Sequence, residues 1–213
     1  MIHKILHTVY TQTTSRQVDR WHMQAEILQL FKKIELTHTP IFASCCEEIE
    51  AVPNHILVHP RQKSKGIYLL CSGIACTIHS KEGMPVVTRF HFAGDFVTSF
   101  ISIYGNTVAE NKVQMLTEGK LIFISFELLE PLRQQLTDLE TLKNRIVALY
   151  WAKDLDMQNR FIYLNATAHY QYLIANHPKL IGLVYLKQIA SFLRIKEGSL
   201  SRIRKQLRDE GLL

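Results

Sequence analysis

The sequence lacks any long apolar run. Its longest apolar stretches, such as 121–126 and 146–151, hold about six residues, whereas a helix needs roughly 20 to cross a bilayer. Residues 1–16 have neither a sustained apolar core nor a small-residue cleavage site, so no signal peptide is expected. With 213 residues, 47% hydrophobic and 21% charged, the chain is expected to be globular, as one large domain or two small ones.

Cysteine is scarce. The four cysteines, Cys45, Cys46, Cys71 and Cys76, are too few for a disulfide scaffold and form no CxxC pair, so reduced thiols in the cytoplasm are predicted. An iron–sulfur cluster needs several suitably placed thiolates, and the adjacent Cys45 and Cys46 cannot readily both face one cluster.

Motifs for catalysis and metal binding are missing as well. No P-loop, HExxH or GxSxG sequence occurs, so an enzyme is not expected. Among ten histidines, two pairs are four residues apart, His3/His7 and His55/His59. The second pair falls on an expected strand, where that spacing separates the residues by about 13 Å. No metal and no cofactor is therefore predicted, although a small-molecule effector stays open.

Glycine is absent from residues 120–181, whereas six glycines fall between Gly66 and Gly119. Around those six, short runs rich in Val, Ile, Leu and Phe are bounded by Gly, Pro, Ser or Asn, which indicates strands of an antiparallel barrel or sandwich. The expected strands are 54–59, 67–71, 74–79, 86–92, 113–116 and 121–126. Helices are expected over 18–34 and, shorter, over 40–49.

The glycine-free part predicts a long helix over 138–164, about 40 Å in length. Leu139, Leu142, Ile146 and Leu149 follow one another at nearly heptad spacing, which favours a seam between two copies of the helix. The alternative is that this face packs on the chain's own barrel.

The segment 186–209 has the pattern of a helix-turn-helix. Such a motif needs apolar side chains on two facing helices and a small residue where the backbones approach. Ile189, Leu193, Leu200 and Ile203 supply the former and Ala190 the latter. We expect helices over 186–193 and 197–208, joined by a turn over 194–196.

The second of these helices carries the residues expected to contact DNA. Arg202 can donate two hydrogen bonds to guanine, and the serines and the remaining cations suit phosphates or base edges. Seven basic and three acidic residues lie in 182–213, a net charge of +4 out of +6 for the whole chain. The alternative is an amphipathic helix with a solvated basic face. The predicted DNA contacts are Lys187, Lys196, Glu197, Ser199, Ser201, Arg202, Arg204, Lys205 and Arg208.

The order of these parts resembles the bacterial catabolite-activator and anaerobic-regulator (CRP/FNR) family of transcription regulators. Residues 66–73 are similar to the family's barrel hairpin, 92–96 to its Gly-Asp-Phe turn, 161–165 to its hinge and 189–207 to its DNA-reading motif. The resemblance implies an α+β fold: a sensor barrel of the cyclic-nucleotide-binding, jelly-roll (β-roll) type over 1–137, a dimerisation helix over 138–164 and a helix-turn-helix domain over 165–213.

The resemblance fails at the ligand pocket. The family's Gly-Glu pair and its phosphate-binding Arg are absent, since Val97 follows Asp95-Phe96 and the segment 107–112 holds no Arg. Glu110 would repel an anion there, so binding of cyclic AMP is not expected. The candidates for lining such a pocket are Phe96, Thr98, Ser99, Glu110, Lys112 and Asp154.

Two departures concern the DNA-binding end. Arg194 occupies a turn position where the family commonly has Gly, at a modest cost in strain. A wing after the second helix, as in winged-helix domains, is expected to be truncated. The function predicted is a cytoplasmic, bacterial, homodimeric regulator that binds palindromic double-stranded DNA. RNA polymerase is a candidate further partner, and no membrane partner is expected. The alternative is a ligand-binding module whose helix-turn-helix contacts protein instead of DNA.

Overall fold

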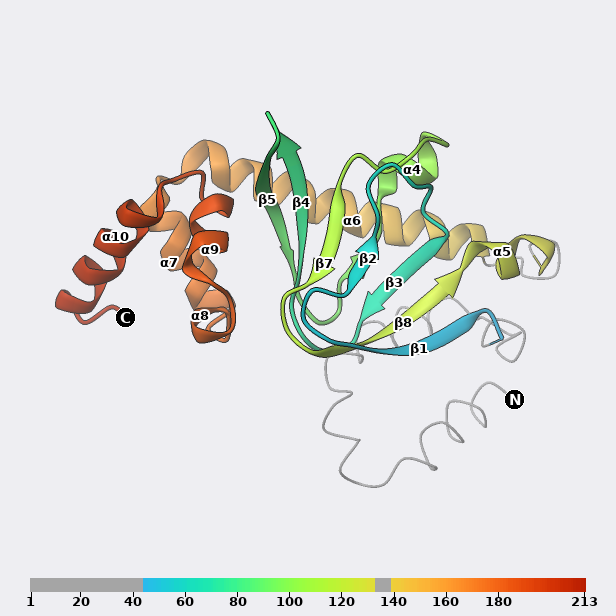
Figure 1. Cartoon of the computed structure of the whole chain (residues 1–213), viewed down its shortest axis with the longest axis horizontal. Coiled ribbons are helices and arrows are strands. Elements are labelled where there is room, and N and C mark those ends of the chain that lie inside the picture. Colours follow the sequence, from blue (N-terminus) through green and yellow to red (C-terminus); the bar gives the residue numbers. More distant parts are fainter. Residues whose placement is uncertain (1–43, 133–138) are drawn as a thin grey trace, which may run out of the picture.

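The computed structural model describes residues 44–132 and 139–213 (Figure 1). The helix expected over 18–34 and the first residues of the one expected over 40–49 lie outside these ranges. Among the described helices, none is both long and apolar enough to cross a membrane.

Residues 44–125 form two antiparallel four-stranded sheets, here called the two-sheet unit. One sheet has the order β1-β8-β3-β6 and the other β2-β7-β4-β5. Six of the eight strands are those expected from the sequence, with ends shifted by a few residues. The bounds are β1 Cys46–Ala51, β2 Ile56–Val58, β3 Gly66–Leu70, β4 Ala75–Lys81, β5 Met84–His91, β6 Phe96–Val97, β7 Lys112–Met115 and β8 Gly119–Ser125.

The helix expected over 40–49 is wrong where the structure describes it, because β1 begins at Cys46. The sequence of β1, CEEIEA, is rich in residues that favour helices. It nevertheless pairs with β8 in continuous register from Cys46–Ile124 to Ala51–Gly119. As the edge strand of its sheet it exposes Glu47, Glu48 and Glu50, and charges on an edge strand oppose pairing with another chain.

Two glycines allow close contacts inside the first sheet. A Cβ atom at Gly66 would lie 2.2 Å from the carbonyl oxygen of Ile124, and one at Gly119 would lie 2.1 Å from that of Ser72. Any larger residue would push β3 and β8 apart at these points, which explains why glycines punctuate this part of the sequence.

The rest of the described chain is helical. The 25-residue α6 runs along the two-sheet unit, and α7 to α10 gather beyond its end, next to β4 and β5 (Figure 1). The helices are α4 Phe100–Tyr104, α5 Phe126–Leu129, the 3-10 turn η2 Glu130–Leu132, α6 Leu139–Tyr163, α7 Ala166–Asn176, α8 Leu180–Leu183, α9 Leu186–Phe192 and α10 Glu197–Asp209.

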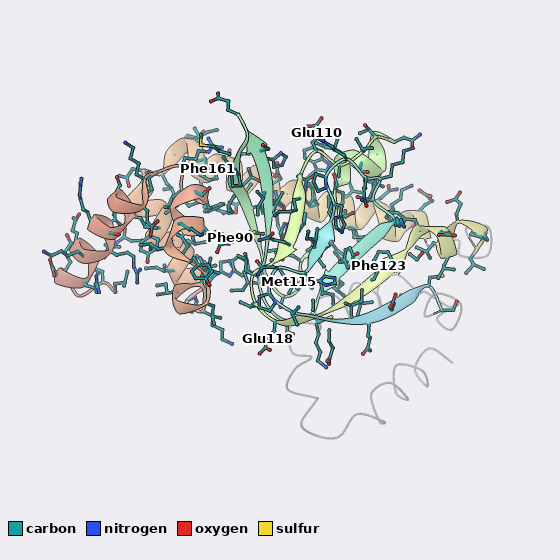
Figure 2. All side chains as sticks on the ribbon, in the orientation of Figure 1. Phe90, Glu110, Met115, Glu118, Phe123 and Phe161 are labelled. Carbon is teal, nitrogen blue, oxygen red and sulfur yellow. The ribbon has the colours of Figure 1, made fainter. Side chains whose placement is uncertain are left out.

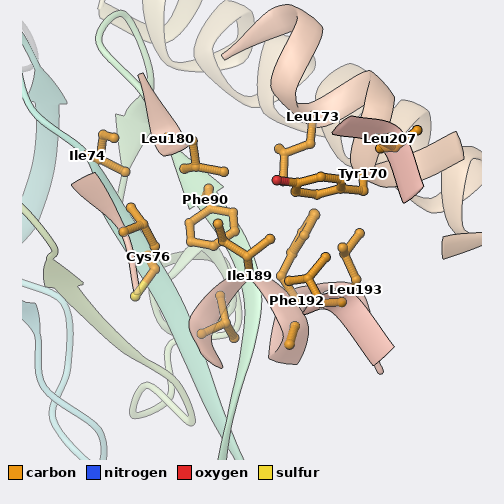
Figure 3. Close-up of a cluster of buried hydrophobic side chains, with 14 residues drawn as sticks. Ile74, Cys76, Phe90, Tyr170, Leu173, Leu180, Ile189, Phe192, Leu193 and Leu207 are labelled. Carbon is orange, nitrogen blue, oxygen red and sulfur yellow. The ribbon is translucent and has the colours of Figure 1, made fainter. Parts of the chain in front are cut away.

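Three apolar clusters hold these elements together. One lies within the two-sheet unit around Leu70, Val113 and Met115, and a second joins the β1-β8-β3-β6 sheet to α6 through Ile146. The third is continuous from β4 and β5 into the C-terminal helices, with Phe90 facing Ile189 and its neighbours (Figure 3). The C-terminal helices therefore dock on the two-sheet unit by direct apolar packing.

Candidate nucleic-acid interface

Helices α9 and α10 meet at a tight turn. Helix α9 ends at Phe192, and the backbone N–H of Ile195 donates back to the carbonyl of Ala190 at 3.0 Å. Arg194 has φ +58°, which is the left-handed conformation that the sequence predicted at this position. Helix α10 starts immediately afterwards, at Glu197.

The two helices pack through the apolar residues expected from the sequence. Ile189, Ala190, Leu193 and Leu200 are all at most 5% exposed, and Ile203 is partly buried against them. Burying one face of each helix fixes α10 with its opposite face toward solvent. Helix α10 lies at the end of the molecule farthest from the two-sheet unit (Figure 1).

The solvent face of α10 is basic and hydrophilic. Arg202, Lys205, Arg208 and Ser201 are exposed on it, and the Ser201 hydroxyl also donates to the carbonyl of Glu197 at 3.1 Å. Lys196 and Glu197 are exposed at its beginning, as is Lys187 on α9, whereas Ser199 is only half exposed. The structure thus brings most of the predicted DNA contacts onto one surface.

Arg204 differs from the other predicted contacts. It is half-buried, and its Nε atom is fully enclosed. It lies beside the buried Tyr170 of α7: burial raises the pKa of the Tyr170 hydroxyl, and the charges of Arg204 and Arg208 offset part of that rise. Arg204 therefore packs inside the C-terminal helices and presents less of its side chain to solvent than Arg202 does.

The Arg194 side chain packs on Phe161, near the end of α6. Its guanidinium carbon lies 4.4 Å from the centre of the Phe161 ring, and Phe161 makes edge contacts with His169 of α7 and Phe192 of α9. Burial, helped by Arg160 and Arg194, lowers the pKa of His169, so this ring stays neutral near pH 7. No local sequence pattern predicts this aromatic cluster, because its members are far apart along the chain.

Strand β5 also contacts the C-terminal helices, chiefly α9. The backbone N–H of Val87 donates to Ser191 Oγ of α9 at 3.0 Å, and the Phe90 ring lies 5.1 Å from that of Phe192. At the end of β5, Phe92 stacks on His177 with ring centres 3.4 Å apart. The orientation of α9, and through it α10, is therefore set by β5.

Helix α6 has two apolar faces, and the structure assigns one of them to its own chain. Ile146, one of the four residues expected at a dimer seam, is only 7% exposed and packs against the two-sheet unit. This agrees with the alternative interpretation of that face, packing on the chain's own barrel. The side chains of Leu139, Leu142 and Leu149 lie outside what the structure describes.

The other apolar face of α6 is uncovered. Trp151 and Leu155 are each 60% exposed and Ile162 is 71% exposed; Ala148 and Gln158 are exposed too. The spacing from 148 to 162 is 3, 4, 3 and 4, the exact repeat of a two-stranded coiled coil. Sequence reasoning missed this stripe because tryptophan, glutamine and aspartates interrupt the leucine pattern.

Three of the predicted pocket residues have structural roles inside the two-sheet unit. The Thr98 hydroxyl donates to the carbonyl of Gly66 at 2.9 Å. The Ser99 hydroxyl caps α4 by accepting from the N–H of Ser102 at 3.4 Å. Phe96 is buried in the cluster that joins the sheet to α6. The two hydroxyls are thus used within the chain.

Aromatic and ionic contacts join α4, β5 and α6. The rings of Phe100 and Tyr150 stack with centres 3.9 Å apart, and the guanidinium carbon of Arg89 lies 4.5 Å from the centre of Tyr150. Arg89 forms an ion pair with Asp154, and both side chains are largely buried. Asp154, a predicted pocket residue, therefore anchors α6 to β5.

The predicted pocket residues do not fit a cyclic nucleotide. Glu110 is exposed at the end of the two-sheet unit beside α4 (Figure 2), Lys112 is half-buried in β7, and the segment 107–112 offers no arginine for a phosphate. Among the described residues, no group of three or more His, Cys, Asp or Glu could hold a metal ion.

Solved structures share this fold. A CRP/FNR-assigned transcriptional regulator from Eubacterium rectale matches with a TM-score of 0.67 at 14% identity, covering 86% of this chain and 88% of its own. The c-di-GMP-responsive global regulator CLP of Xanthomonas campestris matches at 0.64 and 18% identity, covering 82% and 92%. FixK2 of Bradyrhizobium japonicum matches at 0.64 and 12%, covering 78% and 86%.

The fold is therefore that of the CRP/FNR regulators, as the sequence motifs predicted: α+β, with two antiparallel sheets and a set of helices. No protein-family model matches the sequence, and no curated protein matches it either.

Proposed function

We propose that the chain is a homodimeric, sequence-specific DNA-binding transcription regulator of the CRP/FNR type. The observation that carries this proposal is the exposed basic face of α10, held outward by the apolar packing of α9 and α10 around the tight turn at Arg194. This arrangement is the one expected of a helix-turn-helix, whose second helix enters the major groove of DNA.

The side chains on that face can each make a specific kind of contact with DNA. Arg202 is exposed and forms no ion pair with another described residue, so it can donate two hydrogen bonds to guanine O6 and N7. Glu197, at the start of α10, can accept from a cytosine amino group. Lys187, Lys205 and Arg208 suit phosphates, which position the protein without reading sequence.

The uncovered stripe of α6 supports a homodimer. Two copies of the helix can bury Trp151, Leu155 and Ile162 against each other along a coiled-coil seam. In such a dimer the two α10 helices are related by two-fold symmetry, so the operator is expected to be palindromic with half-sites about 34 Å apart. The seam proposed here is the stripe 148–162. Leu139, Leu142 and Leu149, which were predicted to form a seam together with Ile146, share the helical spacing of Ile146 and do not belong to this stripe.

The DNA-contacting face of α10 and the dimer stripe of α6 suggest roles for the rest of the chain. The strand orders β1-β8-β3-β6 and β2-β7-β4-β5 favour a jelly roll in the two-sheet unit. This unit would be the core of a sensor domain over 1–137, with α6 as the dimerisation helix and 165–213 as the DNA-binding domain. Helix α6 ends at Tyr163 and Asn165 caps α7 through a 2.9 Å bond to the N–H of Ala168. A shift at this hinge would change the spacing of the α10 helices and so the affinity for DNA.

Selection of bound sequences from a random pool of double-stranded DNA, with and without cell extract, tests the proposal. Enrichment of one palindromic sequence by the purified protein supports DNA reading. Enrichment only with extract indicates an effector or a partner such as RNA polymerase. If no sequence is enriched under either condition, the proposal is overturned in favour of a module that contacts protein.

A further inference from the structure

Eight of the nine glycines are required by the chain's own backbone. Five adopt the left-handed conformation that other residues rarely adopt, with φ between +69° and +93°: Gly73, Gly83, Gly94, Gly182 and Gly211. The other three, Gly66, Gly105 and Gly119, would place a Cβ atom 2.1 to 2.7 Å from a backbone oxygen. In each case a side chain would strain or displace the fold.

Gly198 is the exception. It is the second residue of α10, is exposed, and has no φ in the left-handed range. A Cβ atom built on it meets no atom within 4 Å. Apart from proline, glycine is the residue that favours a helix least. The fold would therefore accept alanine at this position and gain stability from it.

The position of Gly198 indicates what the glycine accommodates. Ser201, Arg202 and Lys205 lie three, four and seven residues later, so they share its side of the helix and, like it, are exposed. The buried residues Leu200 and Leu207 lie on the opposite side. Gly198 thus belongs to the surface proposed above to enter the major groove, in the first turn of the helix, where base edges are approached most closely.

We propose that Gly198 determines both affinity and sequence specificity by letting the backbone of α10 approach the base edges closely. A side chain at this position would hold the first turn of α10 away from the groove floor, and Arg202 and Ser201 would lose their reach to the bases. The base pair opposite Gly198 is then selected by shape and by its neighbours, with no side chain of this residue to read it. This inference rests on the DNA-binding function proposed above.

The test compares Gly198→Ala and Gly198→Leu with the wild type, using a DNA sequence that the wild type enriches from a random pool. We expect the alanine variant to melt about 1–3 °C higher. We expect it to bind the enriched sequence about tenfold more weakly, and the leucine variant to bind it at least about a hundredfold more weakly. The matched control is Gln206→Ala, an exposed neutral change in the later part of α10, which should bind as the wild type does.

Each outcome separates this inference from the proposed function. If the wild type enriches a sequence and Gly198→Ala binds it as tightly, this inference is overturned while the proposed function stands. A lower melting temperature for Gly198→Ala also overturns it, because the fold itself would then need the glycine. If the wild type enriches no sequence at all, the proposed function fails and the inference fails with it. Weaker binding combined with a raised melting temperature supports it.

Discussion

The guanidinium group of Arg194 covers the ring of Phe161, with 4.4 Å between the guanidinium carbon and the ring centre. The backbone of Arg194 is in the left-handed conformation, which costs about 1 kcal/mol for a residue with a side chain. A cation–π contact of this kind contributes about 0.5–1 kcal/mol. The contact therefore offsets much of the strain and ties the turn before α10 to the end of α6.

Two substitutions at Arg194 separate these effects. Arg194→Gly removes both the strain and the contact, so its free energy of unfolding should stay within about 1 kcal/mol of the wild type. Arg194→Ala keeps the strain and loses the contact, so it should be less stable by about 1 kcal/mol. Urea denaturation measures both. Equal stability of the alanine and glycine variants would show that the turn carries no strain.

The exposed stripe of α6 predicts the effect of a charge at its centre. Leu155→Glu should give a monomer, because a coiled-coil seam does not accept facing glutamates. The monomer should bind an operator at least about a hundredfold more weakly, since the second half-site no longer adds to affinity.

Light scattering after size-exclusion chromatography gives the mass of each variant. Leu128→Glu is the matched control: Leu128 is 52% exposed, against 60% for Leu155, but it lies on α5, away from the stripe. A dimeric Leu155→Glu variant, or a monomeric Leu128→Glu variant, would place the dimer interface elsewhere.

His91 predicts a loss of stability in acid. Its ring is buried and lies 2.7 Å from the Thr77 hydroxyl, with which it shares a hydrogen bond. Burial lowers its pKa from 6.5 to about 4, against a smaller opposing effect of Asp95. Below pH 6.5 the unfolded chain therefore binds a proton that the folded chain does not, and stability falls as the pH drops toward 4.

The size of that loss is about 3 kcal/mol. His91→Gln, which keeps a hydrogen-bonding side chain but does not titrate, should show a correspondingly shallower decrease between pH 6.5 and 4. Denaturation across that range measures the difference between the two proteins. Parallel curves for the wild type and the variant would mean that His91 is protonated as easily in the folded state as in the unfolded one.

The contacts that join α4, β5 and α6 predict that cyclic AMP does not bind to the protein. The Tyr150 ring stacks on Phe100 and lies under the Arg89 guanidinium, so a nucleotide that entered between these elements would have to displace an aromatic ring and break the Arg89–Asp154 ion pair. Cyclic AMP in large excess should therefore leave the melting temperature unchanged. A ligand present at a hundred times its Kd would add about 2.7 kcal/mol of stability, and the clear rise in melting temperature that this produces would contradict the account.

The sequence predicted those parts of the fold whose signals are local. Six strands, the long helix and the α9–α10 pair follow from apolar spacing and from turn residues. The strand β1 was missed because its glutamates favour a helix when read alone, and only its pairing with β8 makes it a strand. Likewise, Ile146 sits in a heptad-like pattern, but no local signal says which apolar face of α6 packs on its own chain.

The candidate interface was predicted more fully than the contacts that support it. Exposed cations on an amphipathic helix can be recognised from their spacing, and Arg202 and Lys205 lie where that spacing places them. The half-burial of Arg204 beside Tyr170 depends on α7, whose place in the fold is set by packing with β5 and α9. Contacts between residues far apart in sequence, such as Arg89 with Asp154, leave no trace in a single sequence.

The most direct test of the central claim is the salt dependence of binding to an enriched operator, measured for the wild type, Arg202→Ala and Lys205→Ala. If α10 binds DNA through phosphate contacts, wild-type affinity should fall steeply and linearly on a log–log plot against salt. Arg202→Ala should lose about 1–3 kcal/mol and its preference at one base pair, whereas Lys205→Ala should mainly reduce the salt slope by about one. Binding that is flat in salt and unchanged in Arg202→Ala would contradict the assignment of α10 as the DNA-reading helix.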